Sequence, residues 1–248
     1  PQYRAGDKVV GYLGWQEFGV SDGTGIYKVD ARVVPLSAYL GAVGMPGVTA
    51  WYGLNRIIAP KEGETILVSS ASGAVGSVVG QLAKIAGCRA VGIAGGAEKC
   101  SYVVAELGFD ACIDYKTQDV NRALKDAAPQ GVDGYFENVG GNIMNAVLPR
   151  MNAFGRIALC GLIAGYDGEP IPITNPTWFL VSRLKMQGFI VSEHMDVWPT
   201  ALKELGSQVI AGRIKYRESI AQGIENAPQA FLGMLRGANF GKQLVKLF

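Results

Sequence analysis

The chain has 248 residues, of which 49% are hydrophobic and 18% charged, a composition typical of a globular protein with a substantial core. Its 23 basic and 21 acidic residues leave a formal net charge of +2, so the charge balance gives no reason to expect nucleic acid as a partner. No apolar run is long enough to span a bilayer, and we expect no membrane association.

The first 36 residues read as short strands and turns. Segments 7–11 and 25–29 are apolar runs set between glycines, which predicts two short strands. Short antiparallel strands need three or more neighbours to be stable. Because the printed sequence supplies none upstream, we expect the molecule to have residues before Pro1.

Segment 38–53 is rich in small residues and contains Gly44-Met45-Pro46-Gly47. This tetrapeptide predicts a turn between two short helical pieces. The second piece leads through Pro60 and Gly63 towards the next strand. Such a segment could join two domains.

The most informative stretch is 65–87, which reads as a buried strand, a tight turn and a helix. The turn carries Ala71-x-Gly73-x-x-Gly76, a dinucleotide-binding fingerprint with alanine in the first glycine position. Gly73 lets a pyrophosphate approach the backbone, and Gly76 and Gly80 let the helix pack close to the sheet. The alternative is a glycine-rich turn that binds nothing, but the strand before it and the helix after it favour a dinucleotide site.

The second strand and helix, at 89–95 and 98–107, bear on the choice of cofactor. In an NAD site, an acidic residue that holds the ribose hydroxyls stands at the end of this strand. Here that place holds Gly95-Gly96, and Lys99 follows at the start of the helix. A lysine beside a helix N-terminus suits a 2′-phosphate, and we therefore favour NADPH over NADH. Taken alone, Lys99 reads better as a solvated helix lysine.

Strands and helices continue to alternate as far as residue 192. This alternation predicts an α/β fold with a doubly wound parallel sheet and helices on both faces. Polar side chains at the carboxyl ends of such strands, here Glu137-Asn138, face the ligand crevice. The further strands are expected at 111–115, 132–139, 156–162 and 185–192, and the further helices at 120–128, 141–151 and 179–184.

The tail from Val197 has a different pattern. It predicts a helix up to residue 210, a strand at 214–220, a helix at 226–235 and a closing strand at 241–248. We expect this tail to return to the first 40 residues and complete a second domain with them.

Potential metal ligands are few. The four cysteines contain no C-x-x-C pair, and we interpret them as free thiols of a cytoplasmic protein. The one histidine, His194, lies beside Glu193 in an expected surface loop. An isolated histidine argues against both a zinc site and a Ser-His-Asp triad, so we expect no metal.

These residues resemble the zinc-independent medium-chain dehydrogenase/reductases, and among them the NADPH-dependent alkenal/one reductases, a group with prostaglandin, plant double-bond and curcumin reductases. The likeness covers nearly the whole chain and rests on seven short segments in the right order. A further segment, Glu225–Phe231, leans towards the curcumin-reductase branch. The seven are Gly44–Ala50, Ser72–Ser77, Ala97–Lys99, Gly108–Ala111, Glu137–Gly141, Gly188–Val191 and Gly237–Lys242.

The resemblance implies two domains: a Rossmann NADPH-binding domain at 43–208, and a GroES-like, β-rich substrate domain formed by 1–42 and 209–248. In the family, about half of the substrate domain precedes the residue that matches Pro1, an amount within ordinary domain sizes. We therefore expect the substrate domain of this chain to lack its N-terminal part.

The resemblance also implies which residues bind the cofactor. The pyrophosphate would be cradled by Gly73, Ala74, Val75 and Gly76, the 2′-phosphate end would be held by Lys99 and Tyr115, and Asn138 and Asn239 would contact the cofactor from a strand end and from the tail. The nicotinamide half would be lined by Cys160, Gly161, Leu162, Tyr166, Phe189, Ile190 and Val191.

The implied reaction is the reduction of the C=C bond of an α,β-unsaturated ketone or aldehyde, with hydride delivered to the β-carbon. Negative charge then develops on the carbonyl oxygen and needs a donor. Tyr166 is the candidate catalytic residue; its alternative role is to pack against the nicotinamide without donating a proton. A tyrosine that some relatives carry on the helix before the sixth strand is replaced near Val181.

Two other functions remain open: an NADPH quinone reductase of a related branch, and a catalytically incomplete NADPH-binding module. The absent N-terminal segment is the reason to keep the second. We also expect a homodimer, because the sixth strand, Met186–Val191, can pair edge to edge across a two-fold axis, as the family's dimers suggest.

Overall fold

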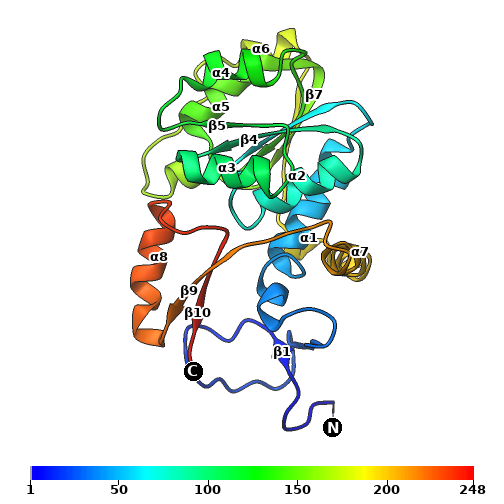
Figure 1. The fold of residues 1–248 in the computed structure, drawn as a ribbon, viewed down its shortest axis with the longest axis vertical. Helices are drawn as coiled ribbons and strands as arrows, with labels where there is room; N and C mark the ends of the chain where they lie inside the picture. Colours follow the sequence, from blue (N-terminus) through cyan, green and yellow to red (C-terminus); the bar gives the residue numbers. More distant parts are fainter. Residues whose placement is uncertain (1) are drawn as a thin grey trace.

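The computed structural model describes residues 2–248 and contains a six-stranded parallel sheet with helices on both faces (Figure 1). Its strands run in the order β5-β4-β3-β6-β7-β8. The direction of winding reverses between β3 and β6, which confirms the predicted Rossmann fold. The strands are β3 (Thr65–Ser69), β4 (Arg89–Ala94), β5 (Ala111–Asp114), β6 (Val132–Glu137), β7 (Met151–Leu159) and β8 (Lys185–Gly188).

Each face of the sheet is covered by its own set of helices, and each has its own hydrophobic core. Successive residues of a strand point to opposite faces, so Tyr135 and Phe136, both fully buried in β6, belong to different cores. The first face carries α1 (Met45–Tyr52), α2 (Gly76–Ile85), α3 (Ala97–Ala105) and α7 (Trp198–Ile210), and the second carries α4 (Val120–Ala127), α5 (Gly141–Val147) and α6 (Thr177–Val181).

Helix α2 approaches its surroundings closely because of two glycines. A Cβ on Gly76 would lie 2.3 Å from the carbonyl oxygen of Ser70, which is the close contact with the turn that the fingerprint predicts. A Cβ on Gly80 would lie 1.8 Å from the ring of Phe109. The second glycine therefore makes room for an aromatic ring in the segment before β5, rather than for the sheet itself as the sequence suggested.

The segment Gly44–Gly47 is not a turn between two helical pieces, as its sequence predicted. A 3₁₀ helix ends at Leu40, α1 begins at Met45 with a proline in its first turn, and α1 continues directly into a π-helix, Gly53–Ile58. The glycines serve a close backbone approach instead: a Cβ on Gly44 would lie 2.0 Å from the carbonyl oxygen of Tyr39.

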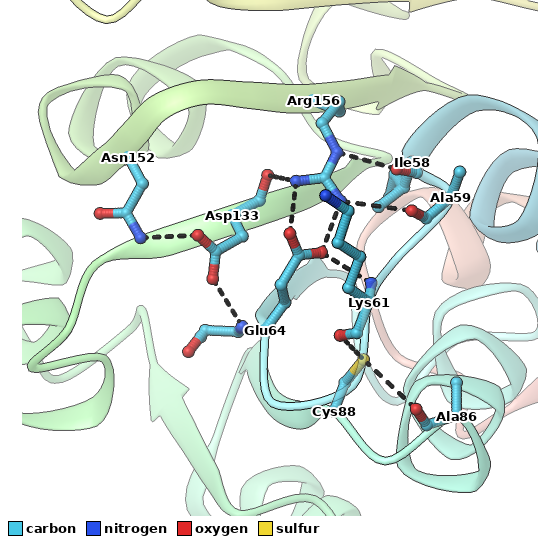
Figure 2. Close-up of polar contacts among 10 residues, drawn as sticks. Ile58, Ala59, Lys61, Glu64, Ala86, Cys88, Asp133, Asn152 and Arg156 are labelled. Atoms are coloured by element: carbon cyan, nitrogen blue, oxygen red, sulfur yellow. Dashed lines mark hydrogen bonds and ion pairs between the residues drawn. The ribbon is translucent and has the colours of Figure 1, made fainter.

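Arg156 fastens the end of the π-helix to the amino edge of the sheet (Figure 2). Its Nε donates to the carbonyl oxygen of Ile58 at 2.8 Å, and its Nη2 lies 2.5 Å from Oε2 of Glu64. Burial alone would raise the pKa of Glu64, but hydrogen bonds from Arg156 and from the backbone of Lys61 outweigh it and lower that pKa. This ion pair lies at the sheet edge opposite the carboxyl ends of the strands.

Strands β7 and β8 differ from their predicted limits. Strand β7 (Met151–Leu159) begins five residues earlier than expected, and it bends at Phe154, whose φ is 63°. Strand β8 ends at Gly188, and a 3₁₀ helix at Val191–Glu193 replaces the rest of the predicted sixth strand. The apolar run up to residue 191 therefore reflects packing after the strand, because Val191 is buried in the first core.

Two small sheets lie below the large one in Figure 1. Strands β1 (Val9–Val10) and β2 (Tyr27–Lys28) are antiparallel and shorter than predicted. Strands β9 (Glu218–Gln222) and β10 (Lys242–Lys246) are parallel and are joined by α8 (Ala227–Leu235). Strand β9 corresponds to the predicted strand at 214–220 but begins four residues later.

The tail returns to the first 40 residues, as predicted. The ring centroids of Trp15 and Phe231 lie 5.7 Å apart, and those of Phe18 and Phe248 lie 6.3 Å apart. Tyr216 also packs against a small core built on Val34, Ala38 and Val43. The domain limits at 43–208 stay a prediction. Within residues 2–248, no helix is long and apolar enough to cross a membrane.

Replacing Gly80 with alanine should destabilise the fold by about 3 kcal/mol, because the added methyl group overlaps the ring of buried Phe109. The matched control is Gly206→Ala in α7, where the nearest atom to the new Cβ is a Val43 methyl carbon at 3.8 Å. The control should be neutral or stabilising by up to about 1 kcal/mol. Urea unfolding of both variants measures the difference, and equal stabilities would contradict the packing described for α2.

Candidate functional site

A cavity of about 610 Å³ opens at the carboxyl ends of β3 and β4, where the winding of the sheet reverses. This is the place where open α/β sheets bind ligands, and the volume is in the range of small-molecule sites. The tail forms the opposite wall. Lining residues include Ser70, Ser72, Gly73, Ala74, Gly95, Lys99, Tyr115, Lys116, Val139, Gly140, Arg236, Gly237, Asn239, Lys242 and Gln243.

The fingerprint turn forms one wall of the cavity. The N–H of Gly73 donates to the carbonyl oxygen of Ser70 at 2.9 Å, and Ser70 itself has a φ of 52°. A Cβ on Gly73 would lie 2.9 Å from the Ser70 hydroxyl, so a side chain there would collide with the turn. The exposed backbone of this turn, followed by the N-terminus of α2, fits a pyrophosphate.

The part of the cavity that is lined by Lys99 and Lys116 is positively charged. Lys99 and Lys116 both line it, and a Cβ on Gly95 would meet the ring of Tyr115 at 2.9 Å. Nζ of Lys99 donates to the carbonyl oxygen of Gly237 in the tail at 2.6 Å. Burial lowers the pKa of Lys99, and the charge of Lys116 lowers it further. Two cations that repel each other favour an anion such as a phosphate between them.

A buried carboxylate lies beneath the loops on the other side of the cavity. The side chain of Glu137 is fully buried and accepts a hydrogen bond from the Ser69 hydroxyl at 2.7 Å. It also accepts hydrogen bonds from the Tyr135 hydroxyl and from the Val139 N–H. Burial and then the charge of Glu137 raise the pKa of Tyr135 well above its usual value. These donors keep the buried carboxylate satisfied without a cation.

The backbone of Glu137 also holds the loop after β7. Its carbonyl oxygen accepts the N–H groups of Cys160 and Gly161 at 2.9 and 3.1 Å. Burial and the nearby Glu137 raise the pKa of the Cys160 thiol to about 12, so Cys160 is a neutral packing residue. Asn138 turns its side-chain amide towards the carbonyl oxygen of Ser69, at 2.8 Å.

The predicted site residues fall into two groups. Gly73, Ala74, Lys99, Tyr115 and Asn239 line the cavity together. The others lie outside its lining: Val75 and Gly76 at the start of α2, Asn138 after β6, Cys160, Gly161, Leu162 and Tyr166 after β7, and Phe189, Ile190 and Val191 after β8.

The residues expected around the nicotinamide are spread over different environments. Phe189 packs edge-on against Phe136 with ring centroids 6.3 Å apart, and Val191 belongs to the first core. Ile190 is exposed, as is Tyr166, whose hydroxyl lies 3.7 Å from the position that a Cβ on Gly161 would take. Phe189 and Val191 therefore contribute to the core, and their role at the nicotinamide stays a prediction.

Sequence reasoning missed several lining residues, among them Lys116, Arg236, Lys242 and Gln243. Lys116 directly follows the predicted Tyr115, so its place was available from the sequence. Lys242 ends Gly237–Lys242, one of the seven segments that carry the family resemblance, but its place at the cavity depends on how the tail folds back.

Metal ligands do not gather in the described chain: residues 2–248 contain no group of three or more His, Cys, Asp or Glu that could hold a metal ion. All four cysteines are free thiols, and Cys100 and Cys112 lie with their sulfur atoms 3.0 Å apart. His194 lies outside the helices and strands, as predicted, but it is partly buried. Its ring stacks on Tyr52 with the ring centroids 4.1 Å apart.

Comparisons with known proteins agree with this geometry. A family model described as zinc-binding dehydrogenase matches residues 74–207. The chain is 44% identical to the NADPH-dependent curcumin reductase of Escherichia coli, with 100% of this chain and 74% of that protein covered. It is also 44% identical to the NADP(+)-dependent 2-alkenal reductase of Nicotiana tabacum, with 99% and 72% covered. The crystal structure of CurA in complex with NADPH from Vibrio vulnificus superposes with a TM-score of 0.89 at 44% identity, covering 95% of this chain and 72% of that one.

Proposed function

Because the chain belongs to the zinc-binding dehydrogenase family, in its zinc-independent branch of alkenal/one reductases, we propose that it uses NADPH to reduce the C=C bond of α,β-unsaturated ketones and aldehydes. The observation that carries the proposal is the cavity at the switch point of the sheet, with Gly73 of the fingerprint turn at its wall and Lys99 and Lys116 at its end. When bound, NADPH supplies the hydride chemistry.

Each part of NADPH is assigned to its own group of residues. The turn Gly73–Gly76, of which Gly73 and Ala74 line the cavity, would hold the pyrophosphate, and the lining residues Lys99, Tyr115 and Lys116 would hold the 2′-phosphate. Gly95 stands at the end of β4, where an NAD-binding protein would carry an acidic residue. Asn239 lies in the opposite wall, where its amide donates to the carbonyl oxygen of Gly241 at 2.8 Å and orders the tail over the cofactor.

The nicotinamide half is assigned to the loops after β7 and β8. Glu137 fixes the first of these loops through the backbone N–H groups of Cys160 and Gly161, which keeps Cys160–Leu162 in place at the strand end. Phe189–Val191 is anchored by its contacts with the first core. With NADPH bound, these loops would orient the nicotinamide ring, and an enone would need to lie beside it with the reacting carbons within about 3–3.5 Å.

Tyr166 donates a hydrogen bond to the carbonyl oxygen of the substrate, where negative charge develops. Two observations support this role: the residue lies after the carboxyl end of β7, and its hydroxyl forms no hydrogen bond within residues 2–248, where the residue is 66% exposed. A hydroxyl that is free to donate is the group that an enolate oxygen needs.

The direct test measures the oxidation of NADPH in the presence of a simple aliphatic enone. The loss of absorbance of the reduced nicotinamide monitors the reaction. We expect turnover with NADPH and little with NADH. Lys99→Met should raise the KM for NADPH about 10-fold or more, because a charged partner of the 2′-phosphate is lost. Lys203→Met on the exposed face of α7 is the matched control and should change nothing.

Three outcomes would contradict parts of this proposal. Faster turnover of a quinone than of any enone would favour a quinone reductase. Binding of NADPH without turnover of either substrate would favour an incomplete binding module. Equal use of NADPH and NADH would contradict the role of Lys99.

Tyr166→Phe should lower kcat for the enone about 10-fold to 1,000-fold and leave the dissociation constant of NADPH unchanged, because the hydroxyl acts on the transition state and not on the cofactor. Single-turnover kinetics at saturating enone separate the two effects. An unchanged kcat would mean that Tyr166 only packs against the nicotinamide.

We further propose that the protein is a cytoplasmic homodimer. The edge strand β8 supports a dimer, because all of its residues are exposed and one edge is unpaired in the sheet order. Sedimentation velocity should give a dimer, and Met186→Lys at this edge should shift it towards monomer; a monomeric parent protein would contradict the proposal. The four free thiols favour a reducing compartment, which cell fractionation tests.

A further inference from the structure

Lys242 stands where the tail meets the fingerprint turn. It is the first residue of β10, and the residue before it, Gly241, forms a parallel bridge with Gly73. Lys242 also lines the cavity. On its other side, a Cβ on Gly41 would lie 3.8 Å from Cγ of Lys242, so the stem of the lysine is packed against the segment before α1.

The ammonium group of Lys242 has no counter-charge in the protein. Among residues 2–248, the ion pairs are made by other basic residues, and no hydrogen bond from Nζ of Lys242 is formed. Burial lowers the pKa of Lys242. A desolvated cation without a partner costs stability, so its presence at this position calls for an anion from outside the chain.

Glu218 is the acidic residue that could serve as a partner within the fold. It is the register partner of Lys242 across β9 and β10, so both side chains share one face of that small sheet. The two nevertheless form no ion pair, and Oε1 of Glu218 is buried without a hydrogen-bond partner. The lysine is therefore not held by its neighbouring carboxylate.

We propose that Lys242 binds the pyrophosphate of NADPH and supplies the positive charge that the fingerprint turn lacks. Segment 70–76 contains no basic residue, so the turn itself can offer N–H groups and the hydroxyls of Ser70 and Ser72 to the phosphates but no positive charge. The Gly73–Gly241 bridge brings the tail to this turn and places Lys242 one residue beyond it. A lysine serves here as a point charge, as it does in other phosphate sites.

This assignment rests on the proposed cofactor and adds a consequence to it. The turn belongs to the large sheet, whereas Lys242 belongs to the tail. An anion bound between them joins the two parts of the molecule and stabilises the tail against the crevice. Lys99 makes a second such link, because in the absence of a phosphate it donates to the tail carbonyl of Gly237.

The test compares two ligands on the full chain by isothermal titration calorimetry: NADPH, and adenosine 2′-monophosphate, which carries the 2′-phosphate but no pyrophosphate. Lys242→Met should raise the dissociation constant of NADPH about 10-fold to 100-fold and leave that of the nucleotide within about twofold. Lys99→Met should weaken both ligands. Lys203→Met is the surface control and should weaken neither.

Two further variants separate binding from structure. Lys242→Arg retains the charge and should recover most of the NADPH affinity. Glu218→Gln should leave NADPH affinity unchanged or improve it. The melting temperature of Lys242→Met without ligand should not fall, because a desolvated charge has been removed; if that variant does not fold, Lys242→Gln replaces it.

The inference is overturned if Lys242→Met binds NADPH within about twofold of the parent protein, or if it weakens both ligands equally. It is also overturned if Glu218→Gln weakens NADPH as much as Lys242→Met does, since Lys242 would then act through that carboxylate. A parent protein that fails to bind NADPH would contradict the proposed function and this inference together, whereas the other outcomes leave the proposed function standing.

Discussion

The buried carboxylate of Glu137 holds together the loops from which the crevice is built. A polar side chain in the interior needs hydrogen-bond partners, and the partners of Glu137 come from the ends of different strands. Ser69 ends β3, Val139 follows β6, and the backbone of Glu137 accepts the N–H groups after β7. These hydrogen bonds therefore tie together the ends of β3, β6 and β7.

The charges along the crevice form a consistent pattern. Lys99 and Lys116 stand at the adenosine end, Lys242 stands at the turn, and the buried Glu137 lies below the loops assigned to the nicotinamide. Positive charges therefore lie where phosphates are proposed to bind.

The sequence predicted the sheet, its winding and the fingerprint turn, because all three depend on local patterns such as the strand–turn–helix at 65–87. It did not predict the π-helix after α1, since that segment is shaped by packing around Gly44 and by the distant Arg156. Nor did it identify Lys242 as a site residue, because the position of this lysine depends on a tail that returns across more than a hundred residues. Side-chain networks such as Ser69–Glu137–Tyr135 likewise join residues whose contact no local pattern encodes.

The most direct measurement is a crystal structure of the protein with NADP⁺ bound. The expected result places the pyrophosphate on the turn Gly73–Gly76 with Nζ of Lys242 against it, and the 2′-phosphate between Lys99 and Lys116. The nicotinamide ring would then lie beside the loop Cys160–Leu162. A cofactor bound in the reverse direction, or a 2′-phosphate in solvent away from both lysines, would contradict the assignment of the crevice.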